Sequence, residues 1–267
     1  MSRWQDLDRE IGLWAAAGRR ASLWWRDDDA VADTPDLRRL LEVARVPLAL
    51  AVIPEAAGPD LAAALARQPG VAVFQHGYRH RNNAAPGAKK CEYPDTRAAD
   101  LSAEELGRGR DRLAALFPRH FLPVFTPPWN RIGVRTVEML AELGLRGLST
   151  YLPRRGASQA GLTVVNTHVD VIDWQNRGFL GEGPALDLLV GHLRARRLGE
   201  VDPDEPTGLL THHLVHDAET WRFLENLQDF LRERPARNRE GSAGIGFIEP
   251  AEAFGMQPGP PAASGLG

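Results

Sequence analysis

The sequence has little cysteine, little net charge and no long apolar run. Its one cysteine, Cys91, cannot form an internal disulfide or a structural site built from several thiolates, so the chain needs no oxidising compartment. The 32 Lys and Arg residues nearly balance the 35 Asp and Glu residues, and the formal net charge of −3 favours neither nucleic acid nor an anionic membrane as a partner. No stretch approaches the ~20 apolar residues that span a bilayer, and the charged first 20 residues do not resemble a signal peptide. We therefore expect a cytoplasmic protein that binds neither nucleic acid nor membranes.

The chain alternates short apolar runs with longer amphipathic segments, a pattern typical of β/α units. Its 267 residues and 43% hydrophobic content suit one α/β domain with a sizeable core. Seven or eight such units predict a parallel barrel or a large doubly wound sheet. Strands are expected at 21–26, 46–53, 71–75, 122–126, 145–149, 162–167, 208–212 and 245–248, and helices at 3–17, 35–45, 60–68, 102–117, 133–143, 184–198 and 217–234.

Two segments depart from this pattern. Residues 256–267 are rich in Pro, Gly and small side chains, so we expect one domain over residues 1–255 followed by a flexible tail. Residues 81–97 form a polar insertion longer than a usual βα loop. This insertion is either a lid or binding element, or a solvated excursion of the chain.

Reactive side chains follow several of the predicted strands, at the point where each strand ends. In a parallel α/β barrel the carboxyl ends of all strands share one face, so segments nearly 200 residues apart can meet there. The candidates are the triplet Asp27, Asp28 and Asp29, the pair His76 and His80, the segment 126–130, the residues Asp170, Asp173 and Trp174, and the pair His212 and His213.

The histidine pair and the acidic triplet together indicate a metal site. His76 and His80 are spaced i and i+4, which brings both imidazoles to one side if the segment enters a helical turn. Three consecutive carboxylates repel one another, and a bound cation would relieve that repulsion, although a solvated acidic turn is the alternative. Two histidines and one aspartate form a catalytic type of zinc shell with a position open for water, and a second aspartate can act as base. The sequence therefore predicts one divalent ion, with Zn²⁺ as first choice.

In this order and at these positions, the segments resemble the five motifs of the polysaccharide deacetylase family, over roughly residues 20–250. The resemblance implies a deformed (β/α) barrel of about seven units. It also implies a metal-dependent hydrolase that removes an acetyl or similar acyl group from an N-acylated sugar or small glycan. A related amidase acting on a non-sugar C–N bond, or a catalytically silent module that binds metal or sugar, are the alternatives.

The first two motifs imply the metal ligands and the base. Reading the triplet as the family's aspartate pair makes Asp28 the general base and Asp29 a metal ligand, with His76 and His80 completing the shell. The register could instead be Asp27 as base and Asp28 as ligand.

The third motif is only partly matched. Pro128 is retained, Trp129 stands in the aromatic place and Asn130 follows it, but the arginine that positions the catalytic aspartate in the family is absent. Arg131 or Arg26 is left to take its place.

The last two motifs are matched in full. Residues 170–174 fit DxxDW, in which the family's second aspartate, here Asp173, orients the acid histidine. In the LxH motif that acid is His212, or His213 if the strand is shifted by one residue.

Five side chains are expected to contact substrate, and the substrate itself is expected to be small. For one of them, His168, a hydrogen-bonded structural role is the alternative. Without a secretion signal, and with a long insertion available as a lid, a short soluble substrate is favoured over an insoluble polymer. The expected contact residues are Pro128, Trp129, Asn130, Trp174 and His168.

Overall fold

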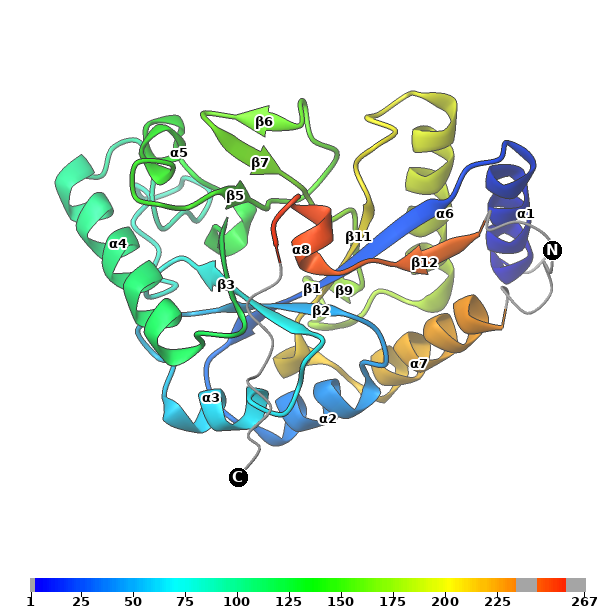
Figure 1. The fold of residues 1–267 in the computed structure, drawn as a ribbon, viewed down its shortest axis with the longest axis horizontal. Coiled ribbons are helices and arrows are strands. Elements are labelled where there is room, and N and C mark those ends of the chain that lie inside the picture. The colour runs from blue at the N-terminus through cyan, green and yellow to red at the C-terminus, as the bar shows by residue number, and fades with distance from the viewer. Residues whose placement is uncertain (1–2, 234–243, 258–267) are drawn as a thin grey trace.

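The computed structural model describes residues 3–233 and 244–257. Within these residues, a ten-stranded, mostly parallel sheet curls around an inner core and carries helices on its outer side (Figure 1). The strands are β1 (Ala21–Ala30), β2 (Leu48–Val52), β3 (Val71–His76), β4 (Phe121–Thr126), β5 (Gly147–Leu148), β6 (Ser158–Gln159), β7 (Leu162–Val164), β8 (Val169–Asp170), β11 (Thr207–Thr211) and β12 (Ile245–Phe247), with a separate hairpin of β9 (Ile172–Asp173) and β10 (Gly178–Phe179).

The helices connect these strands in the order expected of β/α units. They are α1 (Arg3–Ala16), α2 (Pro35–Val43), α3 (Pro59–Leu65), α4 (Ala99–Leu116), α5 (Val134–Leu140), α6 (Glu182–Leu198), α7 (Ala218–Arg232) and α8 (Pro250–Ala253), with short 3-10 turns η1 (Pro128–Asn130) and η2 (His213–Val215). Among the helices of this described part, none is both long and apolar enough to cross a bilayer.

The strand order is β6-β7-β5-β4-β3-β2-β1-β11-β8, with β12 added beside β1. All the pairings in this sheet are parallel except that of β6 with β7. The predicted deformed barrel is therefore confirmed, and each predicted helix and strand is present. The sequence did not predict β6, β8, β9, β10 or α8, and it ended β1 at residue 26 although the strand continues to Ala30.

Alternation along β1 sends consecutive side chains to opposite sides of the sheet. Trp25 packs in the outer core beneath the helices, whereas Trp24 packs in the inner core. By the same alternation Arg26 and Asp28 share the inner side with Trp24, while Asp27 shares the outer side with Trp25. One strand thus delivers charged groups to two separate environments.

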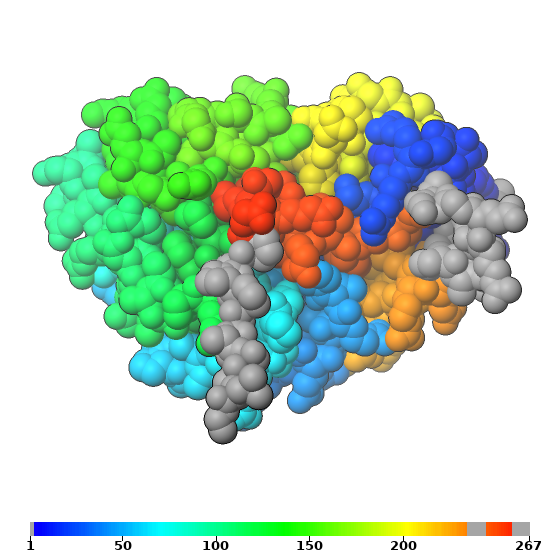
Figure 2. Space-filling view, in the orientation of Figure 1, coloured from blue at the N-terminus to red at the C-terminus, as the bar shows by residue number. Residues whose placement is uncertain are grey.

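Helix α8 packs into the inner side of the curled sheet. Phe254, just beyond it, meets Trp24 edge-on at 5.8 Å between ring centroids and Phe74 at 5.4 Å. Ala49 and Ala51 on β2 belong to the same cluster, and their small side chains leave room for these rings. In Figure 2 the segment from β12 to α8, drawn orange to red, covers the middle of the visible face. The inner core is therefore filled by apolar side chains up to Trp24, and the polar residues beyond it on β1 line the open end.

The tail expected from residue 256 is only partly described. Met256 packs, partly buried, against the inner core cluster. Residues 258–267 lie outside the described residues, so the flexible tail stays a prediction.

Candidate metal centre

The three consecutive aspartates of β1 have three different partners. Asp27 is fully buried on the outer side, where its carboxylate accepts hydrogen bonds from the Thr211 hydroxyl at 2.6 Å and the His213 backbone N–H at 3.0 Å, and its other oxygen contacts the His213 ring. His213 is itself 1% exposed. These placements favour the pair Asp28 and Asp29 over the register that uses Asp27, and they keep His213 away from the open pocket.

Asp28 is held by Arg26 on the inner side of β1. The guanidinium donates to both carboxylate oxygens, from Nε at 2.8 Å and from one terminal nitrogen at 3.0 Å. Its remaining N–H groups donate to Ser149 Oγ at 2.6 Å, to Asn130 Oδ1 at 2.7 Å and to the Thr150 carbonyl at 3.3 Å. All five guanidinium donors are therefore used. Of the two arginines left as replacements for the one missing from the third motif, Arg26, from β1 itself, is the one that the structure shows bound to Asp28.

Asp29 and the two histidines of β3 and its following loop bring three ligand atoms together. Asp29 Oδ1 lies 3.1 Å from His76 Nε2 and 3.2 Å from His80 Nε2. His76 Nδ1 lies 3.0 Å from the Thr126 carbonyl, which can only accept, so Nδ1 carries a proton and Nε2 is the nitrogen that faces Asp29. An outer hydrogen bond of this kind is what orients a metal-binding histidine. The donor set fits one divalent ion.

The electrostatics of the cluster differ among its three groups: burial lowers the pKa of His76, but the hydrogen bond to Asp29 and the charges of Asp28 and Asp29 outweigh that effect and raise it above its ordinary value. Burial alone would raise the pKa of Asp29, but the hydrogen bond from His76 and the charges of the nearby histidines hold it below its ordinary value. Burial and the neighbouring His76 lower the pKa of His80, which keeps that imidazole neutral. An ionised carboxylate and a neutral imidazole are the forms that coordinate a metal.

The two histidines do not meet through a helical turn, as their spacing suggested. His76 ends β3, and the loop after it turns at Gly77 and at His80, with φ values of 60° and 57°. The ring centroids are 5.2 Å apart. A side chain at Gly77 would collide with the Glu92 carboxylate and the Pro128 ring, so the loop needs glycine there.

Glu92 anchors this loop from within the insertion at 81–97. It is 1% exposed and accepts the backbone N–H groups of Tyr78 at 3.2 Å and Arg79 at 2.8 Å. Cys91 and Tyr93 beside it are also buried. This part of the insertion is therefore a folded support for the His80 loop and not a solvated excursion.

Replacing Glu92 by Ala should weaken metal binding about 10–100-fold, the usual cost of losing a group that positions a ligand. The two N–H groups would lose their acceptor, and His80 would no longer be held toward Asp29. Glu92→Gln, which keeps one acceptor oxygen, should lose less. Competition with a coloured chelator measures the affinity, and equal affinities for all three proteins would contradict the anchoring role.

The third motif folds into an unusual backbone. Trp129 and Asn130 are consecutive non-glycine residues with φ values of 57° and 54°, a conformation that costs free energy and persists where the surroundings hold it. The Trp129 ring lies 4.5 Å from that of His80, and Asn130 binds Arg26. Pro128 is buried. The strained turn therefore supports both the metal ligand and the Asp28 partner.

The fourth motif is placed differently from the expectation. Asp173, expected to orient the acid histidine, instead caps a turn by accepting the Gln175 N–H at 2.9 Å and the Asn176 amide at 2.7 Å. Asp170 is the carboxylate of this motif that lines the same pocket as Asp29, His76 and His80, which we call the metal pocket. It interacts with His212 and accepts the Trp174 indole N–H at 2.8 Å. Burial raises the pKa of Asp170, although His212 opposes that effect.

His212 faces Asp28 across the pocket. Its Nε2 lies 4.0 Å from Asp28 Oδ2, and the Trp174 ring meets it edge-on at 4.5 Å. Trp174 is 50% exposed, so one large aromatic face is open to solvent beside the site.

His168 does not line this pocket. It forms a second buried group with His192 and Glu205, whose ligand atoms also lie within 4.8 Å of one another. However, His168 Nδ1 accepts the Gly208 backbone N–H at 2.9 Å, so the ring proton lies on Nε2, which faces Glu205 at 3.3 Å. A metal would have to displace that proton. The geometry therefore favours the structural role for His168 over the expected substrate contact.

The metal pocket has a volume of about 600 Å³, within the usual range for small-ligand sites. Tyr151, Lys90, Arg131 and Arg177 belong to it but were not predicted as contacts, because they lie in loops and bridges without a periodic or motif signal. Its lining residues are Asp28, Asp29, His76, His80, Lys90, Trp129, Asn130, Arg131, Tyr151, Asp170, Trp174, Arg177 and His212.

No family model matches the chain, and no curated protein matches it. Solved structures do. A peptidoglycan N-acetylglucosamine deacetylase, Bc1960, is 13% identical with a TM-score of 0.56, over 94% of this chain and 99% of that one. The chitin deacetylase of Colletotrichum lindemuthianum is 16% identical with a TM-score of 0.53, over 90% and 93% of the two chains. The chain has the polysaccharide deacetylase fold. A family 4 acetyl xylan esterase from Clostridium thermocellum, in complex with a cobalt ion, is 13% identical with a TM-score of 0.54, over 88% and 93%.

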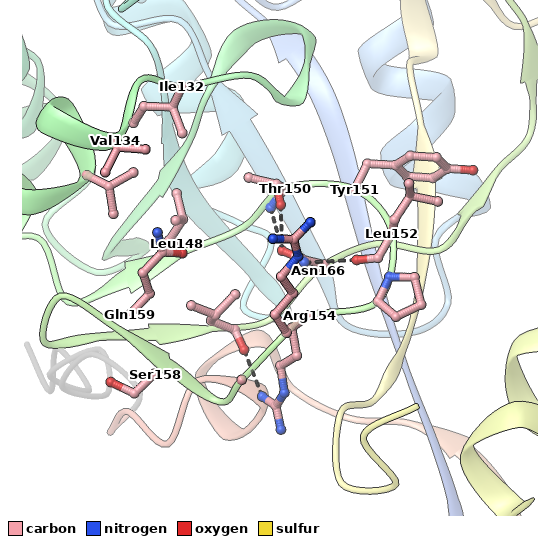
Figure 3. A pocket seen from close by; sticks show the side chains of 15 residues that line it. Ile132, Val134, Leu148, Thr150, Tyr151, Leu152, Arg154, Ser158, Gln159 and Asn166 are labelled. Carbon is pink, nitrogen blue, oxygen red and sulfur yellow. Dashed lines mark hydrogen bonds between the residues drawn. The ribbon is translucent and has the colours of Figure 1, made fainter. Parts of the chain in front are cut away.

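A second cavity of about 670 Å³ lies beside the metal pocket, and Tyr151 lines both. Figure 3 shows Asn166 at its floor, where its side chain accepts from Thr150 and donates to the Leu152 carbonyl. Val134 and Leu152 line the same cavity and are mostly exposed. The two cavities therefore adjoin at Tyr151, and the second has both polar and apolar lining residues.

Proposed function

We propose that this chain is a metal-dependent hydrolase that removes an acetyl or similar acyl group from an N-acylated sugar or short glycan. One observation carries the proposal: a metal-type cluster of Asp29, His76 and His80 shares one pocket with Asp28 and His212. Deacetylase names among structures of the same fold support the substrate class.

Asp29, His76 and His80 would hold one divalent ion, for which we propose Zn²⁺ because the donors are two imidazoles and a carboxylate. Bound there, such an ion supplies Lewis-acid polarisation of a carbonyl and acidifies water. His76 keeps its Nε2 available through the hydrogen bond from Nδ1 to the Thr126 carbonyl.

Asp28 and His212 supply the proton transfers. Asp28 takes the proton of the attacking water, held in position by the two hydrogen bonds from Arg26. His212 gives a proton to the departing nitrogen as the C–N bond breaks, so that acetate and a free amine result. The two groups are 4.0 Å apart at their nearest atoms, close enough to serve opposite sides of one small reacting group. The exposed ring of Trp174 offers a surface on which a sugar can stack.

A short substrate fits this site better than an insoluble polymer. The pocket volume of about 600 Å³ suits a sugar or short oligosaccharide, and Lys90 of the insertion at 81–97 lines it. The cytoplasmic location expected from the composition stays a prediction.

The purified protein, supplied with zinc, should release acetate from N-acetylated chitooligosaccharides. We expect faster release from soluble oligomers than from insoluble chitin at equal acetyl concentration. Dialysis against a chelator should abolish release, and added Zn²⁺ should restore it.

The variants His76→Ala, His80→Ala and Asp29→Ala should each lose the ion, measured as metal per chain by elemental analysis. Arg119→Ala, which changes an exposed residue before β4, is the control and should keep about one ion per chain. An unmodified protein that binds no metal after zinc is supplied would refute the metal site. Metal binding without release of acetate from any acetamide would favour the amidase or the silent module.

A further inference from the structure

Three cationic side chains line the metal pocket and come from three separate segments. Lys90 belongs to the insertion at 81–97, Arg131 follows the strained turn η1, and Arg177 lies in the turn between β9 and β10. All three are exposed, whereas Asp28 is buried beneath them and Asp29 is only partly accessible. The pocket thus has carboxylates at its base and positive charge among its exposed residues.

Within residues 3–233 and 244–257, none of these cations forms an ion pair with a carboxylate. Lys90 lies 5.8 Å from the centre of the Trp129 ring, and Arg131 donates to the Lys90 carbonyl at 3.4 Å. By contrast, Arg79, which precedes His80 in the loop after β3, forms an ion pair with Glu55 at 2.7 Å. Charges of one sign gathered without a counterion are unfavourable in isolation, and a bound anion relieves that cost.

The three carboxylates of the pocket equal these cations in number, but within the described residues each has a different partner and none forms an ion pair with them. Asp28 receives two hydrogen bonds from Arg26, Asp29 contacts both metal-type histidines, and Asp170 accepts the indole N–H of Trp174. A divalent ion at the base would add further positive charge.

We propose that the substrate carries an anionic group, a carboxylate or a phosphate, which Lys90, Arg131 and Arg177 bind at a distance from the acyl amide. This inference rests on the proposed function and narrows its substrate to negatively charged N-acyl sugars. The three cations are specificity residues: they bind the charged group and do not touch the bond that breaks. Their effect is therefore expected on KM and not on kcat.

The test compares acetate release from N-acetylglucosamine 6-phosphate, N-acetylmuramic acid and neutral N-acetylglucosamine by the zinc-loaded protein. We expect kcat/KM to be at least about 10-fold higher for one of the two anionic sugars, and which one it is separates phosphate from carboxylate recognition. Arg177→Gln, Arg131→Gln and Lys90→Gln should each raise KM for that sugar roughly 3–10-fold, with a smaller effect on KM for the neutral sugar. Higher salt should reduce the preference. Arg119→Gln removes the same charge at an exposed position before β4, outside the pocket lining, and should change nothing.

Binding of the same three sugars, measured by calorimetry, separates this inference from the proposed function. Acetate release without preference for either anionic sugar overturns the inference and leaves the function standing. Preferential binding of an anionic sugar without acetate release overturns the function and supports the cationic site. A preference that survives in the triple Gln variant overturns the inference, because the anion would then be held by the metal alone.

Discussion

Asp28→Asn should keep its metal but lose turnover by ~10²–10⁴-fold, the range expected when a general base is removed. The amide is nearly the same size as the carboxylate, and its one oxygen can still accept one of the two Arg26 hydrogen bonds, but it cannot take a proton from water. Asp29, His76 and His80 are untouched, so the metal content should stay at about one ion per chain. Elemental analysis and acetate release, measured on the same preparation, test both halves of this expectation.

Asp173→Asn is the matched control, since it makes the same chemical change at the other aspartate implicated by the motifs. Because Asp173 caps a turn and does not line the pocket, its variant should keep kcat within about twofold. If Asp28→Asn lost the ion while Asp29→Asn kept it, the roles of these two aspartates would have to be exchanged. A loss of kcat in Asp173→Asn would restore the motif-based role of Asp173, and a retained kcat in Asp28→Asn would refute Asp28 as the base.

The order of strands and helices was predictable because apolar periodicity is a local property. The end of β1 was not. Charged residues are rare inside strands, so the acidic triplet was interpreted as the end of the strand. The strand continues because Asp27 meets His213 on one side of the sheet and Asp28 meets Arg26 on the other. Those partners depend on pairing with β11 and on side-chain direction, and neither can be read from the triplet alone.

The aspartate that was expected to orient the acid histidine shows the same limit. Motif spacing selected Asp173, but β8 pairs with β11 so that Asp170 lies opposite Leu210, two residues before His212. That long-range register brings Asp170 into the pocket, and the chain then turns away before Asp173. The sequence predicted that the rings of His76 and His80 lie close together, but it predicted a helical turn between them. The structure instead has positive φ values at Gly77 and His80, in a loop whose backbone N–H groups are held by Glu92.

Arg26→Met should be the most destabilising single change at the site. Arg26 is 0% exposed, and its removal would leave the Asp28 carboxylate buried without its cation. Breaking one side of a buried ion pair typically costs about 3–5 kcal/mol in the free energy of unfolding. Ser149 and Asn130 would also lose a hydrogen-bond donor. Urea unfolding followed by tryptophan fluorescence measures the loss, and a change below about 1 kcal/mol would contradict it.

Arg26→Lys tests positioning separately from stability. Lysine keeps the charge but offers three donors on one nitrogen, so it cannot hold both Asp28 oxygens, Ser149 and Asn130 at once. We expect kcat to fall roughly 10²-fold from misplacement of the base, with KM and metal content unchanged. In the Asp28→Asn background the same change should cost little more, because the group that Arg26 positions is already inactive. The matched control is Arg197→Lys, which alters another two-point pair, with Glu10, between α6 and α1. Equal kcat losses in Arg26→Lys and Arg197→Lys would mean that the effect comes from general destabilisation. A loss confined to Arg26→Lys would assign to Arg26 the positioning of the catalytic aspartate, which the missing motif arginine performs in the family.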